Sequence, residues 1–415
     1  MTQQDVAAPR VAVVVGSSIA GVRAAQALRT EGFVGRIVLV GEEAQQPYDK
    51  PPLSKHFLSG RWDSDKIALL PLQTAETADI ELRLGVPAVR LDVAGKQLVL
   101  ADGSVLQWDV IVLATGAAAR PSPWAASSGV HVVRTMADAS ALRAALEVNA
   151  PVVVVGGGFI GAEVAATARS LGREVTVVDP LMAPIGRVVG AEIGDLFTSL
   201  HRRHGVATRF GIGVKSVEGV AGELVVTLTD GSTVAAGTVV VGIGAVPNDA
   251  WLAGSGLLID NGVMTDEFCR AIDAVDVYAV GDVARCFHAR HQEHIRVEHW
   301  TNAVDMAVVA AHNIVHSDDL RAHEALEYVW SDQYDWKIQI AGRPAAADRH
   351  ELIGSLEGES ARGAILYADD GGALRAAVTV NWPKALAVCR RLLTVGSSFD
   401  DAAVQVRRLV PVTTA

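Results

Sequence analysis

Two glycine-rich segments of this chain have the residue types and spacing needed to hold a phosphate group. The first begins at Gly16, directly after the apolar run that starts at Val11, and ends at Gly21. Gly16 allows a tight turn out of a strand, and Gly21 lets the following helix pack closely on the sheet. The backbone amides at the start of that helix then face a pyrophosphate. Ser18 replaces the middle glycine, which weakens the match but keeps a small side chain there. The predicted contacts are Gly16, Ser18, Ile19, Ala20 and Gly21.

An acidic residue follows each glycine segment at the distance typical of a ribose contact. Glu42 ends the next apolar run, 26 residues after Gly16, and can accept hydrogen bonds from an adenosine ribose. The second segment has all three glycines, and Asp179 follows 23 residues after its first glycine. The predicted contacts in this segment are Gly156, Gly158, Phe159, Ile160 and Gly161.

The charge of Asp179 bears on which nicotinamide dinucleotide binds. A carboxylate favours a free ribose 2′-hydroxyl and repels a 2′-phosphate, so NADH is preferred to NADPH. Arg187 lies eight positions further on and can reach the same nucleotide.

These segments require strands and helices in a fixed order, and the chain provides that order twice. An apolar strand, a glycine turn and a helix occupy residues 11–28 and again residues 152–171. Each repeat closes with an apolar strand that runs into a glycine, at Ala114-Thr115-Gly116 and at Gly242-Ile243-Gly244. The pattern predicts an α/β chain with two Rossmann-like dinucleotide-binding domains, as in the glutathione-reductase-like architecture.

From about residue 327 the pattern changes to short strands, such as 374–380, followed by helical stretches at 384–393 and 400–409. We therefore expect three domains. The FAD-binding domain comprises residues 1–117 and 247–326, the NAD-binding domain residues 118–246, and a smaller α+β domain residues 327–415. Half of the residues are hydrophobic, and the net charge of -11 argues against sequence-independent binding to nucleic acid. No basic leader or membrane-length apolar run is visible, so we expect no membrane association and a cytoplasmic protein. The sequence leaves the oligomeric state open.

The three cysteines, Cys269, Cys286 and Cys389, form neither a metal-binding spacing nor a close redox pair in the sequence. We expect structural thiols, and therefore electrons that leave to an external acceptor rather than through a protein disulfide. His288, His291 and His294 recur at every third position, a spacing that suits neither a helical pair nor a zinc motif, so no metal site is expected there.

Several longer motifs resemble one family, the FAD-dependent ferredoxin reductases of bacterial oxygenase systems. The most specific motif is the proline-rich segment 47–55, which reads Pro-Tyr-Asp-Lys-Pro-Pro-Leu-Ser-Lys. The others are residues 114–116, 134–135, 279–282 and 330–334. The similarity spans nearly the whole chain.

The resemblance implies roles for individual residues. Glu42 and Lys50 would lie toward the adenosine half of FAD, Lys55 close to the flavin, and Asp282 on the ribityl chain, and Pro51 would be a further cofactor contact. Glu163 would meet the nicotinamide amide and pair with Lys55, which makes Lys55 and Glu163 the predicted catalytic residues. The remaining cofactor contacts implied are Ala88, Thr115, Gly116, Arg134, Trp300 and Trp330, with Gly242, Ile243 and Gly244 on the nicotinamide cofactor. Trp300 and its neighbour His299 are larger than the residues expected there, which would alter the potential or the solvent access of the flavin.

The implied reaction is hydride transfer from NADH to FAD, then two single-electron steps to a [2Fe-2S] ferredoxin serving a haem-thiolate monooxygenase or a Rieske dioxygenase. Such ferredoxins are acidic, and candidate cations for docking them are Arg290, Lys337, Arg343, Arg390 and Arg391. One alternative is an NADH oxidase or a reductase of quinones or other small oxidants. Another is a non-catalytic flavoprotein that signals through its redox state.

Overall fold

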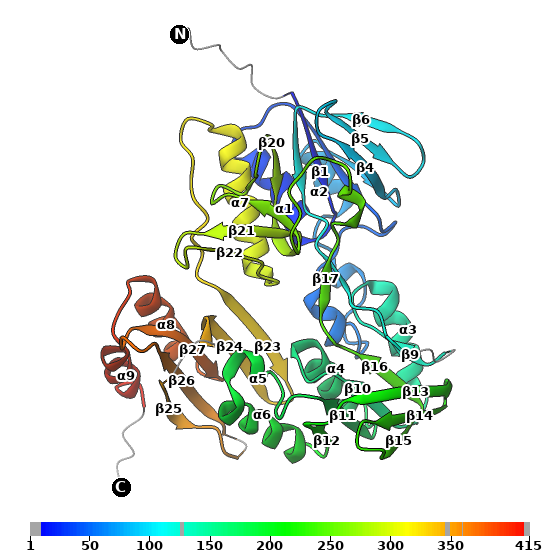
Figure 1. The fold of residues 1–415 in the computed structure, drawn as a ribbon, viewed down its shortest axis with the longest axis vertical. Coiled ribbons are helices and arrows are strands. Elements are labelled where there is room, and N and C mark those ends of the chain that lie inside the picture. Colours follow the sequence, from blue (N-terminus) through cyan, green and yellow to red (C-terminus); the bar gives the residue numbers. More distant parts are fainter. Residues whose placement is uncertain (1–9, 125–127, 345–348, 359, 411–415) are drawn as a thin grey trace. The chain divides into compact units, whose positions relative to one another are not determined.

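The computed structural model describes residues 10–124, 128–344, 349–358 and 360–410 (Figure 1). The chain forms two compact units. The described parts of residues 1–49, 64–118 and 245–325 make up the first unit, and those of residues 50–63, 119–244 and 326–415 make up the second. Residues 50–63 thus pack with the second unit, although they lie within the 1–117 segment that the sequence assigns to FAD. The division into three domains stays a prediction.

The first unit is built on a nine-stranded sheet in the order β22-β21-β18-β19-β20-β7-β1-β2-β3. Its strands are β1 (Val11–Val15), β2 (Arg36–Gly41), β3 (Ile80–Leu84), β7 (Val110–Leu113), β18 (Val263–Thr265), β19 (Arg270–Ala271), β20 (Ala274–Ala279), β21 (Ala284–His288) and β22 (Glu293–Ile295). A three-stranded sheet adds β4 (Ala88–Asp92), β5 (Gln97–Leu100) and β6 (Val105–Gln107), and β8 (Ala117–Ala119) pairs with β17 (Ala245–Pro247). The helices are α1 (Ile19–Thr30), α2 (Leu72–Thr77) and α7 (Trp300–Val315), with short 3-10 turns at Asp65–Ile67, Ala250–Leu252 and Gly281–Val283.

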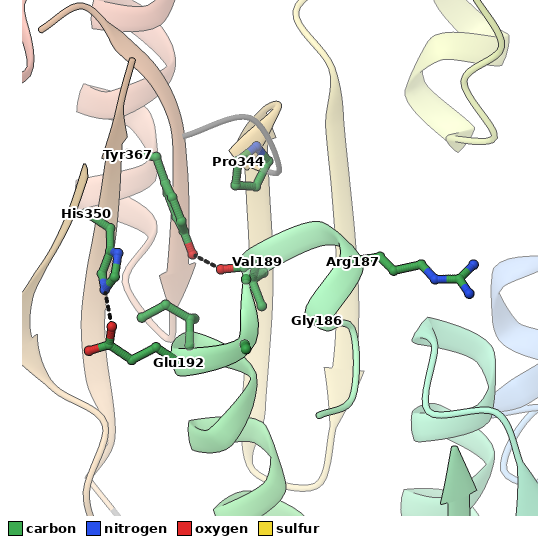
Figure 2. A pocket seen from close by; sticks show the side chains of 10 residues that line it. Gly186, Arg187, Val189, Glu192, Pro344, His350 and Tyr367 are labelled. Carbon is green, nitrogen blue, oxygen red and sulfur yellow. Dashed lines mark hydrogen bonds and ion pairs between the residues drawn. The ribbon is translucent and has the colours of Figure 1, made fainter. Parts of the chain in front are cut away.

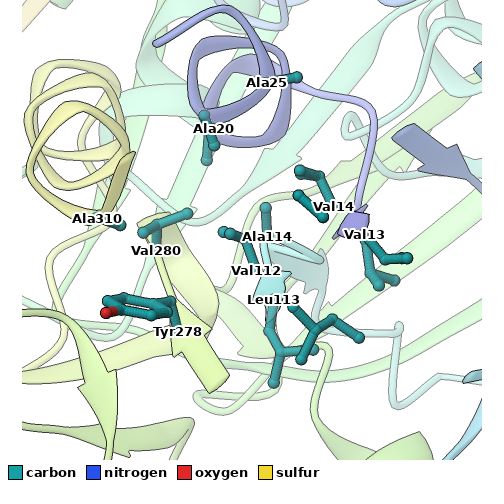
Figure 3. Packing of buried hydrophobic residues seen from close by; sticks show 14 of the residues in the cluster. Val13, Val14, Ala20, Ala25, Val112, Leu113, Ala114, Tyr278, Val280 and Ala310 are labelled. Carbon is teal, nitrogen blue, oxygen red and sulfur yellow. The ribbon is translucent and has the colours of Figure 1, made fainter. Parts of the chain in front are cut away.

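Strand β1 is an interior strand of this sheet, since it is apolar throughout and is paired on both sides. It runs parallel to β2 and to β7, and four of its five side chains are buried. Helices α1 and α7 lie side by side, and their small apolar residues pack against the strands (Figure 3). Helix α1 ends at Thr30 and is capped by Glu31, and the next residue, Gly32, takes a positive φ of 98° that favours glycine as a helix terminator.

The second unit contains a five-stranded parallel sheet in the order β12-β11-β10-β16-β9. These strands are β9 (Val130–His131), β10 (Val152–Val155), β11 (Val175–Asp179), β12 (Ala207–Phe210) and β16 (Thr238–Val241), and an antiparallel sheet holds β13 (Val214–Val220), β14 (Glu223–Leu228) and β15 (Thr233–Ala236). The helices of this part are α3 (Met136–Glu147), α4 (Phe159–Ser170), α5 (Gly186–Val189) and α6 (Ala191–Arg203), with a 3-10 turn at Pro51–Ser54.

The C-terminal part of the second unit is an antiparallel sheet in the order β23-β24-β27-β26-β25, covered by two helices. The strands are β23 (Tyr328–Gln333), β24 (Trp336–Gly342), β25 (Arg349–Ser355), β26 (Arg362–Ala368) and β27 (Leu374–Val380), and the helices are α8 (Pro383–Thr394) and α9 (Phe399–Arg407). The strand predicted at 374–380 and the two terminal helices are therefore present. The predicted fold class, α/β with an α+β C-terminal part, is confirmed. Among the described residues, no helix combines the length and the apolar character needed to cross a membrane.

Candidate active site

The first glycine turn joins β1 to α1 and leaves almost no room for larger side chains. A Cβ on Gly16 would lie 2.2 Å from the carbonyl oxygen of Ala114, and one on Gly21 would lie 1.7 Å from that of Gly16. The first backbone hydrogen bond of the helix runs from the Val22 amide to the Ser18 carbonyl, at 2.9 Å. The amides of the turn before Val22 therefore point out of the helix end, as an anion-binding site requires.

Other predicted FAD contacts of the first unit gather around this turn. Gly281 packs on α1, since a Cβ there would lie 3.0 Å from the Cβ of Ala20, and Asp282 follows it directly. Thr115 is held by a reciprocal pair of bonds with Asn248: its hydroxyl donates to the Asn248 carbonyl at 2.8 Å, and the Asn248 amide group donates to the Thr115 carbonyl at 2.9 Å. Asn248 was not predicted from the sequence, because it lies 133 residues away from Thr115.

The exposed Glu42 stands at the end of β2, next to the segment that leads into Ala88. The amide of Val86 donates to the Gly41 carbonyl, and the amide of Gly85 to the Glu43 carbonyl, both at 3.1 Å. Trp300, the first residue of α7, is anchored elsewhere: its indole Nε1 donates to Asp49 Oδ1 at 2.8 Å.

The second glycine turn, between β10 and α4, has the same geometry. A Cβ on Gly156 would lie 2.2 Å from the Gly242 carbonyl oxygen, and one on Gly161 would lie 1.9 Å from the Gly156 carbonyl oxygen. Gly158 differs, because a Cβ there would meet no atom within 4 Å. The outer two glycines are therefore required by the packing of the protein, while the open space before Gly158 suits an approaching pyrophosphate. Phe159 and Ile160 form the first turn of α4, and Ile243 and Gly244 continue from Gly242.

Asp179 lies at the end of β11, where the fingerprint places it, but its carboxylate also supports the turn. One oxygen accepts from the Gly157 amide at 2.6 Å and the other from the Leu181 amide at 2.8 Å. The residue is 9% exposed. The sequence predicted the ribose contact and missed these two backbone bonds.

Arg187 belongs to the short helix α5 and is exposed. Its side chain points away from a cavity of about 150 Å³ that lies between α5, α6 and the C-terminal sheet (Figure 2). Within this cavity the Tyr367 hydroxyl donates to the Val189 carbonyl at 3.0 Å, and His350 Nε2 lies 3.3 Å from Glu192 Oε2. None of the predicted nucleotide contacts other than Arg187 lines this cavity.

Lys55 and Glu163 form the ion pair that the resemblance implies. Lys55 Nζ lies 2.6 Å from Glu163 Oε2. The Ser54 hydroxyl donates to the same oxygen at 2.5 Å, and the Ser331 hydroxyl donates to Oε1 at 2.8 Å. Glu163 is 2% exposed, so these donors replace the water that a carboxylate otherwise binds.

Three elements of the second unit position this ion pair. Pro51 opens the 3-10 turn that carries Ser54, and Lys55 ends it. Helix α4 carries Glu163 one turn after Gly158, and β23 carries Ser331. Both serines lie in motifs quoted above, but nothing in their spacing predicted contact with Glu163.

Three other predicted cofactor contacts, Lys50, Arg134 and Trp330, also lie in the second unit. Lys50 Nζ donates to the carbonyl of Arg134 at 3.3 Å. Arg134 immediately precedes α3, whose N-terminus is fixed by a capping box between Thr135 and Asp138. Trp330 is half-buried on β23, where its ring stacks with that of Tyr328 at 6.1 Å.

Two of the thiols lie closer together than their sequence separation indicates. Cys269 and Cys286 are both buried, and the hydrogen bond that the Cys269 thiol donates to Cys286, together with burial, raises the pKa of Cys269 well above its ordinary value. Burial raises the pKa of Cys389 to about 12. The hydrogen bond from Cys269 lowers the pKa of Cys286. Cys269 and Cys389 stay protonated and are poor nucleophiles, which agrees with a structural role for these two thiols. Of the three spaced histidines, His288 bonds to the Ala325 carbonyl, while His294 packs edge-on against Phe287.

The similarity to known proteins agrees with this arrangement. Residues 10–307 match the family model described as pyridine nucleotide-disulphide oxidoreductase, and residues 328–408 match the one described as reductase C-terminal. The chain belongs to the pyridine nucleotide-disulphide oxidoreductase family. It is 39% identical to rhodocoxin reductase of Rhodococcus erythropolis over 83% of this chain and 81% of that protein.

Two further matches cover nearly the full length. The ferredoxin–NAD(+) reductase component of the anthranilate 1,2-dioxygenase system of Burkholderia cepacia is 36% identical over 94% of this chain and 95% of that protein. The crystal structure of the covalent putidaredoxin reductase-putidaredoxin complex aligns with a TM-score of 0.88 and 32% identity, over 94% of each chain. The resemblance stated from the motifs is thus confirmed, and this chain is an oxidoreductase that works with FAD and NADH.

Proposed function

We propose that this protein passes electrons from NADH through bound FAD to a [2Fe-2S] ferredoxin that serves an oxygenase. The observation that carries the proposal is the ion pair between Lys55 and the buried Glu163, which lies on the helix that follows the complete glycine turn. A glycine turn alone indicates only nucleotide binding. Lys55 and the buried Glu163, which lies on the helix directly after this turn, add groups that can orient a nicotinamide for hydride transfer.

The residues of the first unit fit FAD, and those of the second unit fit NADH. We assign the amides of residues 18–21, Glu42, Thr115 and Asp282 to FAD, and the turn at residues 156–161 with Asp179 to NADH. When bound, FAD supplies the chemistry that the side chains lack, because it accepts a hydride and releases electrons singly. Glu163 lies next to Lys55 and can accept a hydrogen bond from the nicotinamide amide. The family resemblance implies that Lys55 lies close to the flavin.

A protein acceptor is supported by the thiols and by the relatives. The cysteines are buried, and the described residues contain no disulfide through which electrons would pass. Of the relatives named above, one is the ferredoxin–NAD(+) reductase component of a dioxygenase system, and another was crystallised in a covalent complex with putidaredoxin. The candidate docking cations Lys337, Arg390 and Arg391 are exposed on β24 and α8, where an acidic ferredoxin can meet them.

Rapid mixing of the FAD-loaded protein with NADH tests the first step. We expect the flavin absorption band to bleach, with NADH far more effective than NADPH. Adding a [2Fe-2S] ferredoxin and cytochrome c should then produce cytochrome c reduction that depends on the ferredoxin and falls with rising salt.

Each remaining outcome points to another function. In one outcome, NADH bleaches the flavin, oxygen or a quinone reoxidises it rapidly, and transfer to any ferredoxin is negligible. This outcome would indicate the NADH oxidase or the small-oxidant reductase. Failure of the flavin to bleach would contradict both enzymatic functions and leave a non-catalytic flavoprotein.

A further inference from the structure

A second group of chemically active side chains lies in the first unit, where α1 and α7 end. Glu31 is the residue that caps the C-terminus of α1. His312 lies in the last turn of α7, and His316 caps its C-terminus. Glu31 Oε2 lies 3.1 Å from His312 Nδ1 and 3.0 Å from His316 Nε2. The three atoms all lie within 4.8 Å of one another.

We propose that Glu31, His312 and His316 bind a divalent transition-metal ion of the zinc type. Two histidines four residues apart on a helix present their rings on one face, and a carboxylate completes a common set of three zinc ligands. Bonds of about 2.0–2.2 Å in a tetrahedron place the ligand atoms roughly 3.3–3.5 Å apart. The observed separations of the carboxylate oxygen from both nitrogens need to increase by only a few tenths of an ångström.

The second nitrogen of His312 is placed as it is in protein zinc sites. Its Nε2 lies 2.8 Å from the carbonyl oxygen of Asp319. A metal-bound histidine typically donates its other N–H to a carbonyl or carboxylate, which fixes the ring and its tautomer. In His312, therefore, both ring nitrogens face oxygen atoms, while a neutral imidazole carries a single N–H. A metal ion at Nδ1 satisfies both contacts without adding a proton.

The surrounding charges also favour a cation. The hydrogen bond from His312 holds the pKa of Glu31 below its ordinary value, so the carboxylate is ionised at neutral pH. Two helix C-termini meet at this point, and each carries a partial negative charge. The His312 side chain is 3% exposed, whereas that of His316 is 41% exposed, which leaves an entry path and a fourth position for water.

The place of the site in the fold indicates a structural role. Helix α1 starts at the FAD glycine turn and α7 starts at Trp300, so the proposed ion joins the opposite ends of the same two helices. With a rise of about 1.5 Å per residue, the 12 residues of α1 separate the ion from the glycine turn by roughly 18 Å. The ion would therefore stabilise the FAD-binding unit without contacting the flavin.

Titration of the chelator-treated, FAD-loaded protein with ZnCl2 tests the proposal by calorimetry, and Co²⁺ absorption reports the ligand geometry. We expect one equivalent to bind and the melting temperature to rise. His316→Gln and Glu31→Gln should each weaken binding at least tenfold. His316 is the preferred variant, because its exposure makes a folding defect small.

The matched control is His350→Gln, which removes the histidine of another histidine–glutamate pair that has no second histidine. It should bind Zn²⁺ as tightly as the wild type. The absence of saturable binding near one equivalent would overturn the proposal, and so would binding that survives His316→Gln and Glu31→Gln.

Discussion

Burying the Glu163 carboxylate destabilises the folded protein unless both of its oxygens accept hydrogen bonds. One lysine and two serines, from two separate segments, supply the donors. The family resemblance predicted the pair with Lys55. It could not predict Ser331, because that residue lies 168 positions from Glu163 and meets it only through the fold.

Replacing this carboxylate with an amide separates charge from shape. Glu163→Gln keeps the size of the side chain but leaves Lys55 without its counter-charge and turns one acceptor into a donor. We expect the rate of flavin reduction by NADH to fall by roughly 10- to 100-fold, the range for a misplaced reactant. Stopped-flow absorbance measures it.

Ser331→Ala is the control, because it removes one hydrogen bond and keeps both charges. It should slow flavin reduction far less than Glu163→Gln. Equal rates for the wild type and Glu163→Gln, with FAD bound and the melting temperature preserved, would remove Glu163 from the mechanism.

Two contacts of single residues could not be predicted from the sequence. Asp179 was predicted to contact ribose from its spacing alone, but its bonds to the Gly157 and Leu181 amides depend on how the chain turns after β11. The pair of Cys269 and Cys286 arises because β18 and β21 are adjacent strands, a pairing that no local pattern encodes.

At the scale of elements, the two glycine turns are repeats of one structure. In each, the first glycine faces a carbonyl from a parallel neighbouring strand, and the last faces the carbonyl of the first. This repeat was predictable, because glycine is required wherever a backbone atom occupies the place of a Cβ. The packing of residues 50–63 with the second unit was not, because their proline-rich pattern says nothing of their neighbours.

The different packing of Gly158 and Gly161 allows a direct test of the proposed NADH site. Gly158 has an ordinary φ of -70° and open space in front of it, so Gly158→Ala should fold with a nearly unchanged melting temperature. The added methyl group occupies the space proposed for the pyrophosphate, and we expect the Kd for NADH to rise at least tenfold.

Gly161→Ala is the matched variant, because its Cβ would lie 1.9 Å from a backbone oxygen. It should lower the melting temperature by several degrees or prevent folding. Titration with NADH and thermal unfolding measure both variants. Tight NADH binding by a folded Gly158→Ala protein would place the dinucleotide elsewhere.

At the scale of the whole chain, the C-terminal sheet is part of the second unit rather than an independent appendage. Phe197 packs edge-on against Trp336 at 5.6 Å, and the Tyr367 hydroxyl reaches the Val189 carbonyl. The change of pattern near residue 327 predicted a new sheet. It could not predict this contact with α5 and α6, because Phe197 lies on α6 and Trp336 on β24, more than a hundred residues apart in the sequence.

Helix α6 also carries a buried histidine, His201, which makes the stability of this unit dependent on pH. His201 Nδ1 lies 2.8 Å from the Tyr334 hydroxyl, and burial lowers the pKa of His201 from 6.5 to about 4. Among the described atoms, its Nε2 has no hydrogen-bond partner, so protonation would leave a buried N–H unsatisfied. Because the pKa is lower in the folded state, the stabilisation is complete above pH 6.5 and is lost as the pH falls toward 4.

We therefore expect the wild-type protein to lose on the order of 3 kcal/mol between pH 6.5 and 4 through His201 alone. His201→Gln does not titrate, so it should be less stable than the wild type at pH 7 but lose less as the pH falls. Tyr334→Phe, which keeps the titrating ring, should follow the wild-type pH dependence at a lower stability. Urea unfolding at pH 7.5, 6 and 4.5 measures the three curves, and parallel curves for the wild type and His201→Gln would show that burial of this imidazole does not control acid stability.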